Sequence, residues 1–143
     1  VARLHEAHPN VCGIKEAGGS TDRVTALSAK LGPDFAILSG DDSMTLPFLS
    51  VGAHGVVSVA SNVFVEPLRA MVAAAETDPA EARRIHARFF PLFSALFVEP
   101  NPVPVKFALA ERGIISSSGT RLPLAPLSMA SRELLLSVLA DLP

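Results

Sequence analysis

The stretch VCGIKEAGGS, residues 11–20, decides how the rest of the chain is interpreted. It opens as a short apolar segment, ends that segment on Lys15, and then breaks into two glycines. In an extended strand, Gly13 and Lys15 share one face and Cys12 lies on the other, because successive side chains alternate. Lys15 therefore either extends its ammonium to solvent from the strand end or is buried, where desolvation favours the neutral amine that attacks carbonyl groups.

A strand, a turn and a helix follow one another three times up to residue 76. The strands are short and apolar on both faces, which is typical of a parallel sheet covered by helices. Ser20, Thr21 and Asp22 are candidates to cap the first helix after Lys15, and Gly32 is expected to end it. Three parallel strands leave two open edges, so we expect an arc of a larger α/β fold. The predicted strands are residues 11–15, 35–39 and 55–59, and the predicted helices end near residues 8, 31, 51 and 76.

The second half of the chain is predicted to be helical. A long helix begins at Asp78, and Pro91 inside its pattern is expected to kink it. The segment EPNPVP, residues 99–104, precedes a helix that ends at Arg112, and a last helix is expected over residues 128–141. Apolar residues that share one face of the long helix are expected to be buried in the core, with an extension of the phenylalanines into a subunit contact left open: Ile85, Phe89, Phe93, Leu96 and Phe97.

Composition excludes several classes of function. The 143 residues carry a net charge of −2 without a basic cluster, which argues against nucleic acid as a partner. No apolar run reaches the roughly 18 residues of a membrane span, and no N-terminal secretory pattern is present. The single cysteine excludes an internal disulfide and fits a reducing cytoplasm. The chain lacks an initial Met, so we expect a processed or partial chain, and without Tyr it has no tyrosine for catalysis.

Three other groups are candidates for chemistry. The segment SGDDS, residues 39–43, could hold a metal or orient a substrate, but Asp and Ser after a strand more often cap the next helix. His54 could be a general base, yet it precedes a strand, whereas barrel sites form at the carboxyl ends of strands, so a structural role is favoured. Cys12 is interpreted as a small core residue rather than a nucleophile.

Five motifs follow one another along the chain: GIKEAGGS, ILSGDD, GAHGVVSVASN, LFVEPNPVPVK and RLPLAPL. Together they resemble the dihydrodipicolinate synthase family, within the pyruvate-dependent Schiff-base aldolases that include N-acetylneuraminate lyase. The resemblance covers essentially the whole chain and corresponds to the C-terminal half of the family's enzymes. The motifs occur in the family's order and spacing. The motifs ILSGDD and LFVEPNPVPVK favour the synthases over the lyases.

The resemblance implies an α/β fold, the C-terminal part of a (β/α)₈ TIM barrel followed by a helical extension. The three predicted strands would be the sixth to eighth of the barrel. Residues 1–76 would form the partial barrel, and residues 77–143 the last barrel helix and the extension. Since a barrel domain takes about 250 residues, strands one to five would lie outside this sequence.

The resemblance also assigns roles to two residues. Lys15 matches the family's Schiff-base lysine at the end of the sixth strand, and Val57 matches a position whose backbone contacts pyruvate. The implied reaction condenses pyruvate with aspartate semialdehyde in the lysine (diaminopimelate) pathway, with no metal or organic cofactor. The implied setting is a cytoplasmic homo-oligomer, a tetramer or a dimer, without nucleic-acid or membrane partners.

Two alternatives stay open at this point. The family's proton-shuttle tyrosine and carboxylate-binding threonines belong to the part that this sequence lacks, so another pyruvate-dependent aldolase or lyase of the family would leave the same pattern here. A non-catalytic half-barrel used for assembly would also lack tyrosine. If the chain is part of a synthase or of another enzyme of the family, we expect the chain alone to be inactive.

Overall fold

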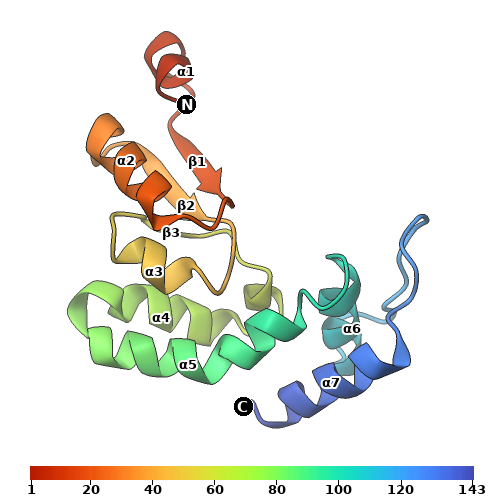
Figure 1. The fold of residues 1–143 in the computed structure, drawn as a ribbon. Coiled ribbons are helices and arrows are strands. Elements are labelled where there is room, and N and C mark those ends of the chain that lie inside the picture. Colours follow the sequence, from red (N-terminus) through yellow and green to blue (C-terminus); the bar gives the residue numbers. More distant parts are fainter.

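Three short parallel strands form the only sheet of the computed structural model, which describes all residues 1–143. The strands β1 (Gly13–Glu16), β2 (Ala36–Ser39) and β3 (Gly55–Val56) lie in chain order, with β2 in the centre (Figure 1). Lys15 pairs with Leu38, and Leu38 pairs with Gly55. The parallel arrangement is confirmed, but β3 is shorter than the predicted strand over residues 55–59, because the chain turns away from the sheet after Val57.

Helices pack on one face of this sheet. After α1 (Ala2–Ala7), the helices α2 (Thr21–Leu31) and α3 (Thr45–Leu49) follow β1 and β2. Of the three cap candidates, Ser20 caps α2 by accepting from the Arg23 amide, and Gly32 ends the helix as predicted, at a φ of 75°. A small core of buried side chains joins these helices to the sheet. The side chains come from α2, from β2 and the residue before it, and from α3: Val24, Phe35, Ile37 and Phe48.

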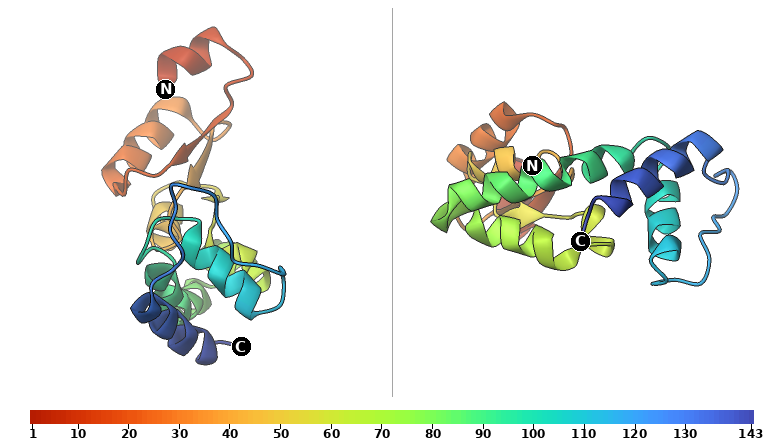
Figure 2. Two further views of the ribbon diagram at one scale, coloured as in Figure 1. Left: turned by 90° about the vertical axis from the view of Figure 1, so that its right-hand side faces the viewer. Right: turned by 90° about the horizontal axis from the view of Figure 1, so that it is seen from below.

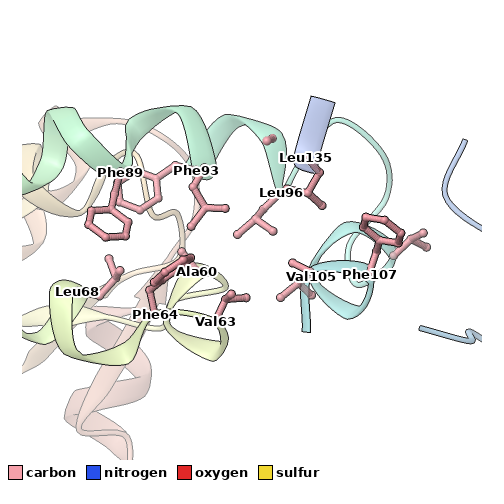
Figure 3. Close-up of a cluster of buried hydrophobic side chains, with 14 of the residues drawn as sticks. Ala60, Val63, Phe64, Leu68, Phe89, Phe93, Leu96, Val105, Phe107 and Leu135 are labelled. Atoms are coloured by element: carbon pink, nitrogen blue, oxygen red, sulfur yellow. The ribbon is translucent and has the colours of Figure 1, made fainter. Parts of the chain in front are cut away.

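The remaining helices build a second and larger core. After the 3₁₀ turn η1 (Ala60–Asn62) come α4 (Val65–Thr77), α5 (Pro79–Ala95), α6 (Val103–Glu111) and α7 (Met129–Ala140). Asp78 caps α5, which continues past Pro91 to Ala95. Figure 3 shows apolar side chains of α4 and α5 meeting those of α6 and α7, and Figure 2 shows that this helical part lies to one side of the sheet. Seventeen buried residues share this cluster.

Two expectations about burial are wrong. Phe97 is exposed, although Phe89, Phe93 and Leu96 are buried. The reason is that α5 ends at Ala95, so the helical spacing that placed Phe97 on the buried face no longer applies. Cys12 is also exposed, because it precedes β1 at the sheet edge, where no helix covers it. No helix of the chain is long and apolar enough to cross a membrane.

His86 makes the stability of the helical core depend on pH. The side chain lies on α5 between Phe90 and Phe93, with ring centroids 5.9 and 5.8 Å away, and its buried Nδ1 has no hydrogen-bond partner. Burial lowers the pKa of His86 below its usual value. The unfolded chain therefore binds the proton more readily than the folded chain does, so the free energy of unfolding should fall as the pH drops below about 6.5.

We expect His86→Leu to remove this part of the pH dependence. The slope from one proton cannot exceed about 1.4 kcal/mol per pH unit, and it is measured by urea denaturation between pH 5 and 8. The control is His8→Gln, because His8 is exposed and its replacement should leave the slope unchanged. Equal slopes for the wild type and His86→Leu would contradict the assignment.

Candidate active site

The carboxyl ends of the three strands meet at one edge of the sheet, where parallel strands commonly place their functional groups. Lys15 stands near the end of β1, Gly40 follows β2, and Val57 follows β3. The register pairs Lys15 with Leu38 and Leu38 with Gly55, and alternation then puts Gly40 and Val57 on the same face as Lys15. The two outer strands are about 10 Å apart, two strand spacings, so Lys15 and Val57 flank a shared patch centred on Gly40.

The side chain of Lys15 lies over Gly40. A Cβ on Gly40 would stand 3.0 Å from Cε and 3.2 Å from Cγ of Lys15, and 2.7 Å from the Cβ of Ala17. Only glycine leaves this path open without displacing the lysine. Gly13, which the sequence suggested as the source of room beside Lys15, instead faces Ala36, whose oxygen would lie 2.7 Å from an added Cβ.

Lys15 is exposed in the structure, and its amine forms no hydrogen bond or ion pair with the chain. Of the two alternatives for Lys15, these 143 residues show the exposed one, because the face of the sheet that carries Lys15 has no second layer of side chains opposite it. What the fold does provide is a position for the side chain: its alkyl part lies over Gly40, the residue that follows the central strand.

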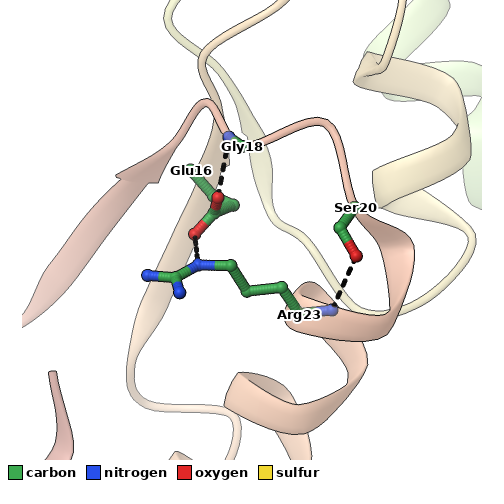
Figure 4. A network of polar contacts seen from close by, with 4 residues as sticks. All are labelled: Glu16, Gly18, Ser20 and Arg23. Atoms are coloured by element: carbon green, nitrogen blue, oxygen red, sulfur yellow. Dashed lines mark hydrogen bonds and ion pairs between the residues drawn. The ribbon is translucent and has the colours of Figure 1, made fainter.

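Glu16, the residue after Lys15, points to the helix-covered face and is only 3% exposed. Figure 4 shows its carboxylate accepting from the Gly18 amide at 2.8 Å and pairing with Nε of Arg23 on α2. These contacts fix the end of β1 and thereby the backbone of Lys15. The role of Glu16 was not predicted from the sequence; the available signals were its alternation with Lys15 and an arginine in the first turn of the following helix.

The two aspartates after β2 have different roles. Asp41 forms a local turn in which Oδ1 accepts from the amide of Ser43 at 2.9 Å and from its hydroxyl at 3.0 Å. The predicted capping of the next helix is not observed, since the N-cap of α3 is Met44 and no side chain caps it. Asp42 instead bonds across to the segment after β3.

Asp42 is 1% exposed. One carboxylate oxygen accepts from the hydroxyl of Ser58, and the other accepts from the amides of Val59 and Ala60 at 3.0 and 2.9 Å. These bonds draw the chain out of the sheet and into η1, which explains why β3 ends earlier than predicted. No group of three or more His, Cys, Asp or Glu side chains is close enough to hold a metal ion.

Val57 follows β3 and has a backbone carbonyl without a partner in the chain. Its amide donates to the carbonyl of Ser39 at 2.8 Å, and no hydrogen bond within the chain uses its own carbonyl. The side chain is 43% exposed. The patch therefore combines a free amine, a free backbone acceptor and an apolar side chain, a set that can attack a small carbonyl compound and hold the resulting adduct.

His54 lies at the opposite end of β3 from this patch. Its Nδ1 accepts from the amide of Ile37 at 3.1 Å, and its Nε2 is 3.2 Å from the carbonyl of Pro33. Both ring nitrogens thus lie within hydrogen-bonding distance of backbone groups, which confirms the predicted structural role.

The sequence matches the model of the dihydrodipicolinate synthetase family over residues 1–142. It is 48% identical over 141 residues to the 4-hydroxy-tetrahydrodipicolinate synthase of Persephonella marina, covering 98% of this chain and 48% of the relative. The corresponding enzyme of Thermomicrobium roseum is 48% identical over 142 residues, covering 99% of this chain and 46% of the relative.

Solved structures give the same result. The 4-hydroxy-tetrahydrodipicolinate synthase of Methylacidiphilum fumariolicum SolV aligns with a TM-score of 0.93 and 54% identity over 97% of this chain and 46% of the other. Dihydrodipicolinate synthase from Aquifex aeolicus aligns with a TM-score of 0.94 and 39% identity, over 97% of this chain and 47% of the other. The chain thus spans about half the length of the relatives it matches.

Proposed function

Because the chain belongs to the dihydrodipicolinate synthetase family, a family of TIM-barrel enzymes, we propose that it carries the amine-bearing half of a synthase that condenses pyruvate with aspartate semialdehyde. The observation that carries this proposal is the free amine of Lys15, whose alkyl chain lies over Gly40 on the face of the sheet that it shares with Val57, a residue with an unpaired carbonyl. The strands β1, β2 and β3 are proposed to be strands six to eight of a (β/α)₈ barrel. Residues 1–76 would form this part of the barrel, and residues 77–143 would form its last helix and the extension.

The proposed reaction begins when Nζ of Lys15 attacks the ketone of pyruvate. Loss of water gives an imine, and the protonated imine nitrogen withdraws electrons so that the pyruvate methyl group releases a proton. The resulting enamine carbon attacks the aldehyde of aspartate semialdehyde. The amino group of the former aspartate semialdehyde then bonds to the imine carbon and closes the ring, while the bond from that carbon to Nζ of Lys15 breaks and returns the free amine.

The chain's own residues support these steps in two ways. The Val57 carbonyl can accept from a hydroxyl or N–H of the adduct on Lys15, and Gly40 keeps the path of the lysine open. The proton transfers require a general acid–base from outside this chain, which has no tyrosine. We place the complete enzyme in the lysine pathway of the cytoplasm, as a homo-oligomer.

The test is a chimeric enzyme in which this chain replaces the matching 141-residue segment of the Persephonella marina synthase. Turnover of pyruvate with aspartate semialdehyde is compared with that of the parent synthase, with sugar aldehydes as alternative acceptors. We expect kcat/KM for pyruvate within about tenfold of the parent, since both segments would supply the same groups. A chimera that folds as the parent does but forms no imine with pyruvate would contradict the proposal and favour a non-catalytic role.

Val57 is expected to contribute modestly to pyruvate binding. Val57→Ala keeps the backbone carbonyl and removes two methyl groups, a loss of about 1–2 kcal/mol, so KM for pyruvate in the chimera should rise roughly 5- to 30-fold with little change in kcat. The matched control is Val56→Ala on the opposite face, which should leave KM unchanged. A loss of activity as deep as that from replacing Lys15 would show that the role of Val57 is misjudged.

A further inference from the structure

The segment between β2 and α3 contacts both sides of the proposed site. At one end, Gly40 lies under the alkyl chain of Lys15, and its amide donates to the carbonyl of Glu16 at 2.8 Å. Two residues later, Asp42 holds the segment that follows Val57. A single short segment therefore connects the strand that carries the amine with the strand that carries the free carbonyl.

Asp42 is well placed to fix this connection. Its buried carboxylate receives three donors from residues 58–60, and Ser58 Oγ in turn accepts from the amide of Ser61 at 2.8 Å. Charged acceptors of backbone amides form the stronger class of hydrogen bonds. Leaving such buried donors without an acceptor would be costly, so the backbone after Val57 has little freedom to move while Asp42 is in place.

We propose that Asp42 is a positioning residue, an inference that rests on the proposed function. It fixes the position of the Val57 carbonyl relative to Lys15 and so determines how tightly pyruvate binds. At 1% exposure, the carboxylate is not accessible to a substrate, so its effect passes through the backbone of residues 57–60. Asp41, the adjacent aspartate, bonds only within its own turn and has no such effect on pyruvate.

Two substitutions at this position separate positioning from other roles. Asp42→Leu has a similar size but offers no acceptor, so the hydroxyl and both amides lose their partner. Asp42→Asn can turn its oxygen toward the two amides and its NH₂ toward Ser58 Oγ, which has a second lone pair available. The position of the Val57 backbone should therefore be largely kept in Asp42→Asn and lost in Asp42→Leu.

The experiment measures imine formation with pyruvate in the chimera by borohydride trapping, together with KM and kcat. We expect Asp42→Leu to raise the half-saturating pyruvate concentration at least about tenfold, with kcat reduced less than about threefold, and Asp42→Asn to raise it less than about threefold. Asp41→Asn is the matched control and should leave trapping by pyruvate unchanged. Amide hydrogen exchange at residues 59 and 60 should accelerate in Asp42→Leu.

Several outcomes would overturn the proposal. Unchanged half-saturation in a folded Asp42→Leu variant would do so, as would equal losses in Asp42→Asn and Asp42→Leu, which would assign the effect to charge. If Asp42→Leu does not fold, Ser58→Ala decides: it removes one donor to Asp42 and should raise half-saturation about two- to fivefold, and no change would refute positioning. The unsubstituted chimera is tested first, so a failure of the proposed function is recognised separately.

Discussion

Replacing Lys15 with alanine should abolish trapping of pyruvate by borohydride and lower kcat of the chimera by about 10³-fold or more, because the covalent step loses its nucleophile. Lys15→Arg keeps the positive charge but offers no amine that forms an imine under these conditions, and it should fail equally. This pair of variants separates the chemistry of the amine from its electrostatic contribution.

The location of the adduct provides the decisive measurement. Borohydride reduction in the presence of pyruvate should add one covalent adduct per chain, and mass spectrometry of peptides should map it to Lys15. The other lysines of the chain are suitable controls: Lys30 lies on α2, and Lys106 donates to the carbonyl of Gly119. Reproducible mapping of the adduct to Lys106 or Lys30 would refute the assignment of the nucleophile.

The second large effect concerns the chain by itself, which we expect to be inactive. General acid–base catalysis is typically worth roughly 10²–10⁴-fold, and the positioning of reactants contributes more. The chain has no tyrosine, and Lys15 and Val57 stand exposed on an uncovered face of the sheet. The outer edges of β1 and β3 have no neighbouring strand, so we also expect the isolated chain to associate.

This prediction is tested by purifying residues 1–143, determining their mass in solution, and assaying pyruvate with aspartate semialdehyde. Adding the N-terminal half of the Persephonella marina synthase in trans should raise activity if the halves form a barrel, whereas an unrelated parallel-sheet protein should not. A monomer of residues 1–143 with turnover of about 1–10³ s⁻¹, the range of ordinary enzymes, would refute the prediction. A proton shuttle within this chain would then have to be sought.

Much of the secondary structure was predictable because its signals are local. Ser20 and Gly32 bound α2 as expected, and Asp78 caps α5. The apolar runs indicated parallel strands, and the alternation of side chains separated Lys15 from the helix-covered face. These features depend on neighbours within a few residues, whose spacing the sequence displays directly.

Exposure and the length of β3 were predicted less well because they depend on distant contacts. The sequence indicated a strand to residue 59, but Asp42 withdraws Ser58, Val59 and Ala60 from the sheet through bonds that span 16 to 18 residues. Cys12 was expected in the core and is exposed, because its surroundings depend on which helix covers the edge of the sheet. Periodicity carries no information about either feature.

The sequence by itself determined the α/β character, the parallel strands, the family and the choice of Lys15 and Val57 as candidates. Tertiary structure decided that Gly40, and not Gly13, borders the lysine, that Glu16 is buried against Arg23, and that Asp42 ties the segment after β3 to the segment after β2. The physical reason is that motifs and periodicity are properties of neighbouring residues. Contacts between strand ends arise only when the register brings together residues that lie far apart in the chain.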